Sequence, residues 1–109
     1  MITVLVQFQL PEPVTLERAH ALFMGSAPNY LGIDGLVRKY YLLSEDGQTA
    51  GGAYLWQSKE QAASFYSDTW RDMIVERYGA NPTVSYFQTP VVVDNLVGEV
   101  IEDGPSSAT

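Results

Sequence analysis

The sequence contains no cysteine and only one histidine, and both absences restrict its chemistry. Without thiols the chain has no disulfide, no thiolate nucleophile and no ligands for a zinc–thiolate site or an iron–sulfur cluster. His20 has no partner that would complete a metal site or a catalytic triad, so we interpret it as a residue on the flank of a helix. We therefore expect no bound metal.

Positive charge is also scarce, because 6 lysines and arginines face 13 acidic residues and give a net charge of −7. A protein that binds nucleic acid needs a basic stripe, and Arg38-Lys39 is the only adjacent basic pair. Anionic membrane surfaces are disfavoured for the same reason. The apolar segment 2–10 ends at Pro11, and no run approaches the roughly 18 apolar residues of a membrane span. We expect a soluble, cytoplasmic protein with neither nucleic acid nor membrane as a partner.

The length of 109 residues fits one domain. We expect residues 1–95 to form it and residues 96–109 to be an acidic C-terminal extension with a disordered end. Aromatic residues make up 12% of the chain, and charged residues make up 17%, less than the usual quarter. This composition suggests that part of the surface is hidden in an oligomer or lines a pocket.

Hydrophobic periodicity and turn signals divide the chain into alternating strands and helices. Period-two alternation begins at Ile2, and the signals for capping are Thr15 before the first helix and Ser58 before the second. The expected elements are a strand at 2–10, a helix between Thr15 and Pro28, strands at 36–44 and 49–57, a helix at 58–77 and a strand at 83–94, with Pro90 at an edge or bulge. This order predicts a ferredoxin-like α+β fold, a four-stranded antiparallel sheet with two helices on one face.

The dipeptide Asp46-Gly47 predicts a type I′ hairpin turn, which fixes the pairing of its two strands. Lys39 then lies opposite Tyr54 and on the same face as Trp56, whereas an odd loop length would exchange the roles of Arg38 and Lys39. With the helices on one face, we expect the aromatic face to be uncovered. A homodimer with these two faces packed together would cover it.

Four blocks of the sequence resemble one known family. The blocks are Gly35-Leu-Val-Arg-Lys-Tyr-Tyr41, Gly51-Gly-Ala-Tyr-Leu-Trp56, Glu76-Arg-Tyr-Gly79 and Pro90-Val-Val-Val-Asp-Asn95. In this order they resemble the YdhR-type monooxygenases over residues 1 to about 95. The resemblance implies a dimeric α+β barrel, the superfamily that also contains cofactor-independent quinone-forming monooxygenases.

The candidate catalytic residues are Lys39 and Trp56, as cationic and N–H donors to a developing oxyanion in a barrel cavity. The alternative is that they only pack across strands at a dimer interface. The candidate substrate-binding residues are Asn29 and Tyr30 at the mouth, and Tyr41 and Tyr54 inside.

We expect a monooxygenase without a cofactor that acts on a small electron-rich aromatic compound, phenolic or polycyclic. A dinucleotide fingerprint is missing, because Gly51-Gly52 lies inside a predicted strand rather than at a strand-to-helix turn. The alternative is a non-catalytic dimeric protein that binds a small aromatic ligand. Haem degradation is disfavoured, because residues 58–77 contain no histidine to serve as an axial ligand.

Overall fold

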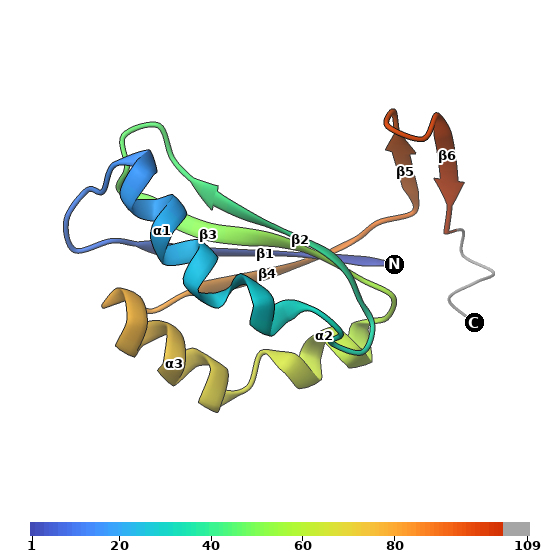
Figure 1. The fold of residues 1–109 in the computed structure, drawn as a ribbon. Coiled ribbons are helices and arrows are strands. Elements are labelled where there is room, and N and C mark those ends of the chain that lie inside the picture. Colours follow the sequence, from blue (N-terminus) through green and yellow to red (C-terminus); the bar gives the residue numbers. More distant parts are fainter. Residues whose placement is uncertain (104–109) are drawn as a thin grey trace.

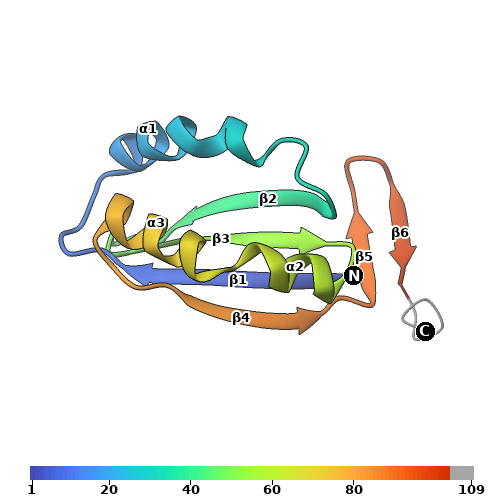
Figure 2. The same ribbon diagram turned by 90° about the horizontal axis from the view of Figure 1, so that it is seen from below.

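A computed structural model describes residues 1–103 of the chain, and the expected disordered end at residues 105–109 lies outside this range. The elements are β1 (Ile2–Gln9), α1 (Leu16–Ser26), the 3₁₀-helix η1 (Ala27–Tyr30), β2 (Leu36–Leu43), β3 (Thr49–Trp56), α2 (Lys59–Phe65), α3 (Asp68–Tyr78), β4 (Thr83–Gln88), β5 (Val91–Asp94) and β6 (Glu99–Glu102). Strands β2, β3, β1 and β4 form, in this order, one antiparallel sheet with the helices on one face (Figures 1 and 2). The predicted ferredoxin-like α+β fold is confirmed.

The alternation along β1 separates the two faces of the sheet. Val4, Val6 and Phe8 are buried and belong to the hydrophobic core, whereas Gln7 and Gln9 are exposed. The core lies between the sheet and the helices. Among residues 1–103, every helix is too short or too polar to cross a lipid bilayer.

The β2–β3 hairpin has the predicted register near its turn but a different turn geometry. Lys39 pairs with Tyr54 as predicted, whereas a bulge at Val37 leaves Leu36 opposite Trp56. The predicted type I′ turn is wrong. Such a turn needs positive φ at both central residues, Asp46 and Gly47, and among the described residues only glycines have positive φ. Gly47, with φ of 75°, is the third residue of the four-residue loop 45–48, and a Cβ there would lie 2.2 Å from the Val14 carbonyl oxygen.

The helix expected over residues 58–77 is two helices, α2 and α3. Tyr66 leaves helical geometry, with φ of −84° and ψ of 59°. The Ser67 hydroxyl then accepts a hydrogen bond from the backbone N–H of Trp70 at 3.2 Å and caps α3. The break lets Phe65, Tyr66 and Trp70 turn toward the sheet from two helices, where they pack against one another.

The face of the sheet that bears Tyr54 and Trp56 is covered by the helices, which corrects the prediction that it is uncovered. Trp56 is fully buried and Tyr54 is 2% exposed. Their rings contact Phe65 and Tyr66, at the C-terminal end of α2. A dimer cannot pair through this face, and the outer face is the one left open.

The strand expected over residues 83–94 divides at Thr89-Pro90 into β4 and β5. Pro90 has no N–H for a sheet ladder, and the chain turns away there to form the β5–β6 hairpin, which projects from the sheet as an arm (Figures 1 and 2). The boundary expected at residue 95 falls in the turn of this arm. Its base is fixed because Thr89 donates to the Met1 carbonyl at 2.9 Å and the N-terminal ammonium pairs with Asp103.

Candidate functional site

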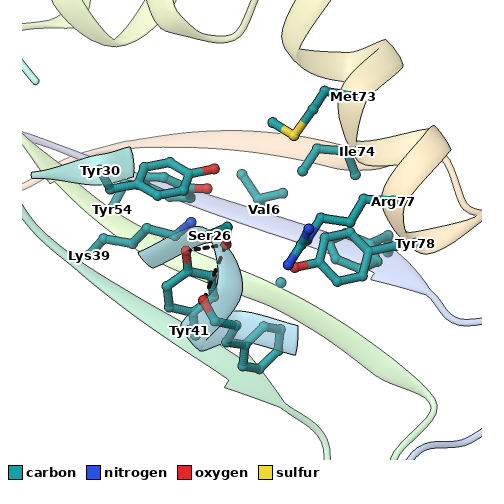
Figure 3. A pocket seen from close by; sticks show the side chains of 13 residues that line it. Val6, Ser26, Tyr30, Lys39, Tyr41, Tyr54, Met73, Ile74, Arg77 and Tyr78 are labelled. Carbon is teal, nitrogen blue, oxygen red and sulfur yellow. Dashed lines mark hydrogen bonds between the residues drawn. The ribbon is translucent and has the colours of Figure 1, made fainter. Parts of the chain in front are cut away.

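A small cavity lies between the inner face of the sheet and helices α1 and α3. Its free volume is about 20 Å³, which is room for about one water molecule. It is lined by Val6, Phe8, Phe23, Ser26, Tyr30, Lys39, Tyr41, Gly51, Tyr54, Met73, Ile74, Arg77 and Tyr78. Figure 3 shows Lys39 from β2 and Arg77 from α3 extending toward this shared space.

The Lys39 ammonium lies among three tyrosine rings, which we call the tyrosine cage. Nζ is 3.3 Å from the ring centroid of Tyr30, 3.8 Å from that of Tyr41 and 4.6 Å from that of Tyr54. These distances are typical of cation–π contacts, each of which stabilises a desolvated cation by about 1–2 kcal/mol. Within residues 1–103, Nζ takes part in no hydrogen bond and no ion pair, so the rings are its partners.

Burial lowers the pKa of Lys39 to about 7, because the charged form loses hydration and no carboxylate lies beside it. Burial raises the pKa of Tyr54 and, assisted by its neighbours, that of Tyr41. Both tyrosines are therefore neutral phenols at neutral pH, and the Tyr41 hydroxyl is hydrogen-bonded to that of Ser26 at 2.8 Å. The lysine is thus the cavity group whose charge changes near neutral pH.

Glycine 52 provides the space in which the cage forms. It pairs with Tyr41 across the hairpin and is buried on the same face as Tyr54. A Cβ at this position would lie 3.3 Å from Lys39 Cε and 3.2 Å from Tyr54 Cε1. The absence of a side chain lets the lysine stem run over the strand toward the rings.

Arg77 is a second cation of this cavity, and sequence analysis did not select it. It is exposed, and its Nη2 donates to the Leu22 carbonyl oxygen at 2.5 Å, which joins α3 to α1. Gly25 makes this approach possible, since a Cβ there would lie 2.8 Å from Nη2. The Glu76-Arg77-Tyr78-Gly79 block of the resemblance was the available signal, but it gave no reason to prefer the arginine.

The structure brings four of the predicted site residues together and separates two from them. Lys39 meets the three tyrosines of the cage, as predicted for a common cavity. Trp56 does not line it, because the indole is fully buried and its N–H donates to the Tyr66 hydroxyl at 3.0 Å. Asn29 is exposed on η1 and is not a lining residue. A direct role for Trp56 as an oxyanion donor therefore has no geometric support.

The charge of the cavity determines what it can bind. Its lining residues include two bases and no acid, and residues 1–103 contain no cluster of three or more potential metal-ligating side chains. Cationic donors in a poorly hydrated space stabilise an anionic oxygen strongly. The arrangement is suited to binding an oxyanion against aromatic walls.

No family model matches the sequence, and no curated protein matches it. Solved structures do share the fold. A monooxygenase from the gene ActVA-Orf6 of Streptomyces coelicolor, in complex with nanaomycin D, is 18% identical with a TM-score of 0.62 over 81% of this chain and 86% of that one. A variant of SnoaB, a cofactor-independent oxygenase from Streptomyces nogalater, is 11% identical with a TM-score of 0.61 over 86% and 97%.

A candidate antibiotic biosynthesis monooxygenase from Deinococcus radiodurans is 9% identical, with a TM-score of 0.63 over 86% of this chain and 97% of that one. At such low identity the similarity establishes the fold alone. The chain therefore has the fold of the antibiotic biosynthesis monooxygenases.

Proposed function

We propose that the protein is a cofactor-independent monooxygenase that oxidises a small, electron-rich phenolic or polycyclic aromatic compound. The observation that supports this most is the partly buried Lys39 ammonium, which lies in the tyrosine cage without a counter-ion. The structural neighbours with oxygenase activity support the reaction class, and the four sequence blocks support a YdhR-type relationship. Fold alone does not define an activity, so the chemistry of the cavity is the stronger argument.

In the proposed reaction, the neutral Lys39 amine takes the proton of the bound phenol. The resulting ammonium then holds the phenolate, whose electron-rich ring reacts with O₂. One oxygen atom enters the ring as a carbonyl, and the other leaves as water, whose two hydrogens are the phenolic proton that Lys39 took up and the single hydrogen of the oxidised carbon. A pKa of about 7 suits this role, because both forms of the lysine are present near neutral pH.

A ring-sized substrate needs more space than the cavity now encloses. The residues that we expect to move are Tyr30, which lies on the short helix η1, and Met73, which is 41% exposed on α3. Gly32 and Gly35 follow Tyr30 with φ of 76° and 84°, a conformation that favours glycine. Displacement of Tyr30 would open the cage on the side of η1.

We also propose a homodimer that pairs through the outer face of the sheet. This face exposes Tyr40 and Phe87, each at 54%, and the arm exposes Leu96 at 97%. The sheet and the arm border a groove of about 490 Å³. A second copy of the chain would cover these apolar side chains symmetrically, and Phe87→Glu is expected to yield monomers in analytical ultracentrifugation.

Oxygen consumption tests the proposed function. The purified protein, with a metal chelator present, is expected to consume O₂ with anthrones or dihydroxynaphthalenes, and ¹⁸O₂ should place one labelled atom in each product. Binding of these compounds without O₂ consumption would instead support the alternative, a non-catalytic binding protein for small aromatic ligands. If these compounds neither bind nor cause O₂ consumption, the assignment of the cavity as the substrate site is contradicted.

A further inference from the structure

The distribution of charge in the cavity is opposite to that of the whole chain. The chain has 13 acidic and 6 basic residues, yet two of the basic side chains line this cavity and no acidic one does. Lys39 supplies one charge from the tyrosine cage, and Arg77 supplies the other from its exposed position on α3. A phenolic oxygen accounts for only one of these cations.

We infer that the ligand is an aromatic acid, which places its phenolic oxygen at Lys39 and a carboxylate at Arg77. The inference rests on the proposed function for the position of the ring, and it adds the second anionic group and the residue that recognises it. Arg77 is then a specificity-determining residue.

The geometry of Arg77 suits a carboxylate. A guanidinium has five N–H donors in a planar fork that matches the two oxygens of a carboxylate, and the structure gives this one a single hydrogen bond, to Leu22. The remaining donors are available to a ligand. The exposed end of the cavity also suits a permanently charged group, because its carboxylate need not lose all of its hydration.

Lys39 has the complementary properties. The ammonium is enclosed by aromatic faces, so the group that reaches it must pass between rings, and an arene does so at little cost in desolvation. The Ser26 and Tyr41 hydroxyls, 2.8 Å apart, add further partners for an oxygen at this depth. The predicted ligand thus has its ring between two cations, with an acidic group on the outer side.

Calorimetric binding of matched naphthalenes tests this assignment without requiring turnover. The probes are 6-hydroxy-2-naphthoate, its neutral carboxamide and 2-naphthol. Wild type is expected to bind the carboxylate at least about tenfold more tightly than the carboxamide, because hydrogen bonds to charged groups are the stronger ones. The net charge of −7 opposes this preference, so a local cation must produce it.

Arg77→Gln is expected to bind the acid and the amide equally, with the affinity for the amide unchanged within about twofold. Arg77→Lys keeps the charge and should recover part of the preference, which also guards against a folding defect in the glutamine variant. The matched control is Arg71→Gln, because Arg71 lies on the same helix but donates to the Pro82 carbonyl at 2.7 Å, outside the cavity. This control should retain the wild-type preference.

Two results would overturn the inference and leave the proposed function standing. One is equal affinity of wild type for acid and amide, and the other is a preference for the acid that persists in Arg77→Gln. Failure of every probe to bind, 2-naphthol included, would overturn both the inference and the proposed site.

Discussion

Arg38 and Lys39 are neighbours in the sequence, but they lie on opposite faces of the sheet and in different surroundings. Lys39 points to the helices, where burial lowers its pKa to about 7 and three tyrosine rings enclose it. Arg38 points to the outer face, where it is exposed and lies 3.7 Å from the Asp94 carboxylate of the arm. Two adjacent cations therefore have two different surroundings, one in a cavity and one on a surface.

The same contrast holds for the aromatic residues of the two faces. Trp56 on the inner face is fully buried and hydrogen-bonded, and Phe87 on the outer face is 54% exposed. The inner face thus provides the core and the candidate site, and the outer face is available for another chain. Substitutions matched across the two faces can test this division.

The largest difference is expected for truncation of these aromatic side chains. Trp56→Ala should lower the free energy of unfolding by about 3–5 kcal/mol, because it leaves a cavity in the core. Phe87→Ala should change it by about 0.5 kcal/mol or less in the monomer, since the ring is already hydrated. Urea unfolding at a concentration where the chain is monomeric measures both, and similar losses would contradict the division into faces.

The two adjacent cations should differ in their effect on turnover of a phenolic substrate. Lys39→Met preserves the length and apolar contacts of the stem, and kcat should fall by about 10²–10³, the usual effect of removing one oxyanion donor. Arg38→Met, on the same strand and the opposite face, should leave kcat unchanged. Steady-state oxygen consumption distinguishes the cases, and a loss confined to Arg38→Met would move the site to the outer groove.

Much of this arrangement follows from local sequence signals. The alternation in β1 defines a strand, and the Asp46-Gly47 loop sets the pairing of Lys39 with Tyr54 even though its turn type differs from the prediction. That pairing places Lys39 on the face of Tyr54 and Tyr41, so the core of the tyrosine cage was predictable. These features depend on contacts between residues close in the sequence.

The remaining features depend on tertiary contacts. Both faces of the sheet contain aromatic and aliphatic residues, so periodicity alone does not tell which one the helices cover. Which face of the sheet the helices cover depends on the paths of the loops that lead into α1 and α2. Arg77 joins the site only because α3 lies beside α1 near Gly25. By contrast, the Ser67 cap was a readable signal within the long helical pattern.

A smaller difference is expected for two tyrosine hydroxyls. Tyr66→Phe removes the acceptor of the buried Trp56 N–H and should cost about 1–3 kcal/mol, because an unpaired donor is left in the core. Tyr40→Phe removes the partner of Arg38 at 3.4 Å on the exposed outer face and should cost about 0.5 kcal/mol or less. Chemical denaturation of the two variants measures the loss in the free energy of unfolding for each, and equal losses would contradict the expected difference between the faces.

The smallest effect concerns the dependence of stability on pH. The folded pKa of Lys39 is about 7 and its ordinary value is 10.5, so between these values the unfolded chain holds a proton that the folded chain has released. Stability therefore rises with pH above about 7. The rise should be about 1–2 kcal/mol up to pH 9, before the tyrosines of the unfolded chain ionise near pH 10.

Lys39→Met should remove this rise and increase stability at pH 6, because the folded state no longer buries a charge. The matched control is Lys59→Met, since Lys59 is the only other lysine and lies exposed at the start of α2. Its stability should follow the wild-type pH profile. Urea unfolding at intervals between pH 6 and pH 9 measures all three proteins. A profile that is the same in Lys39→Met and wild type would show that the lysine is hydrated in the folded protein, and would remove the main electrostatic difference between the two faces.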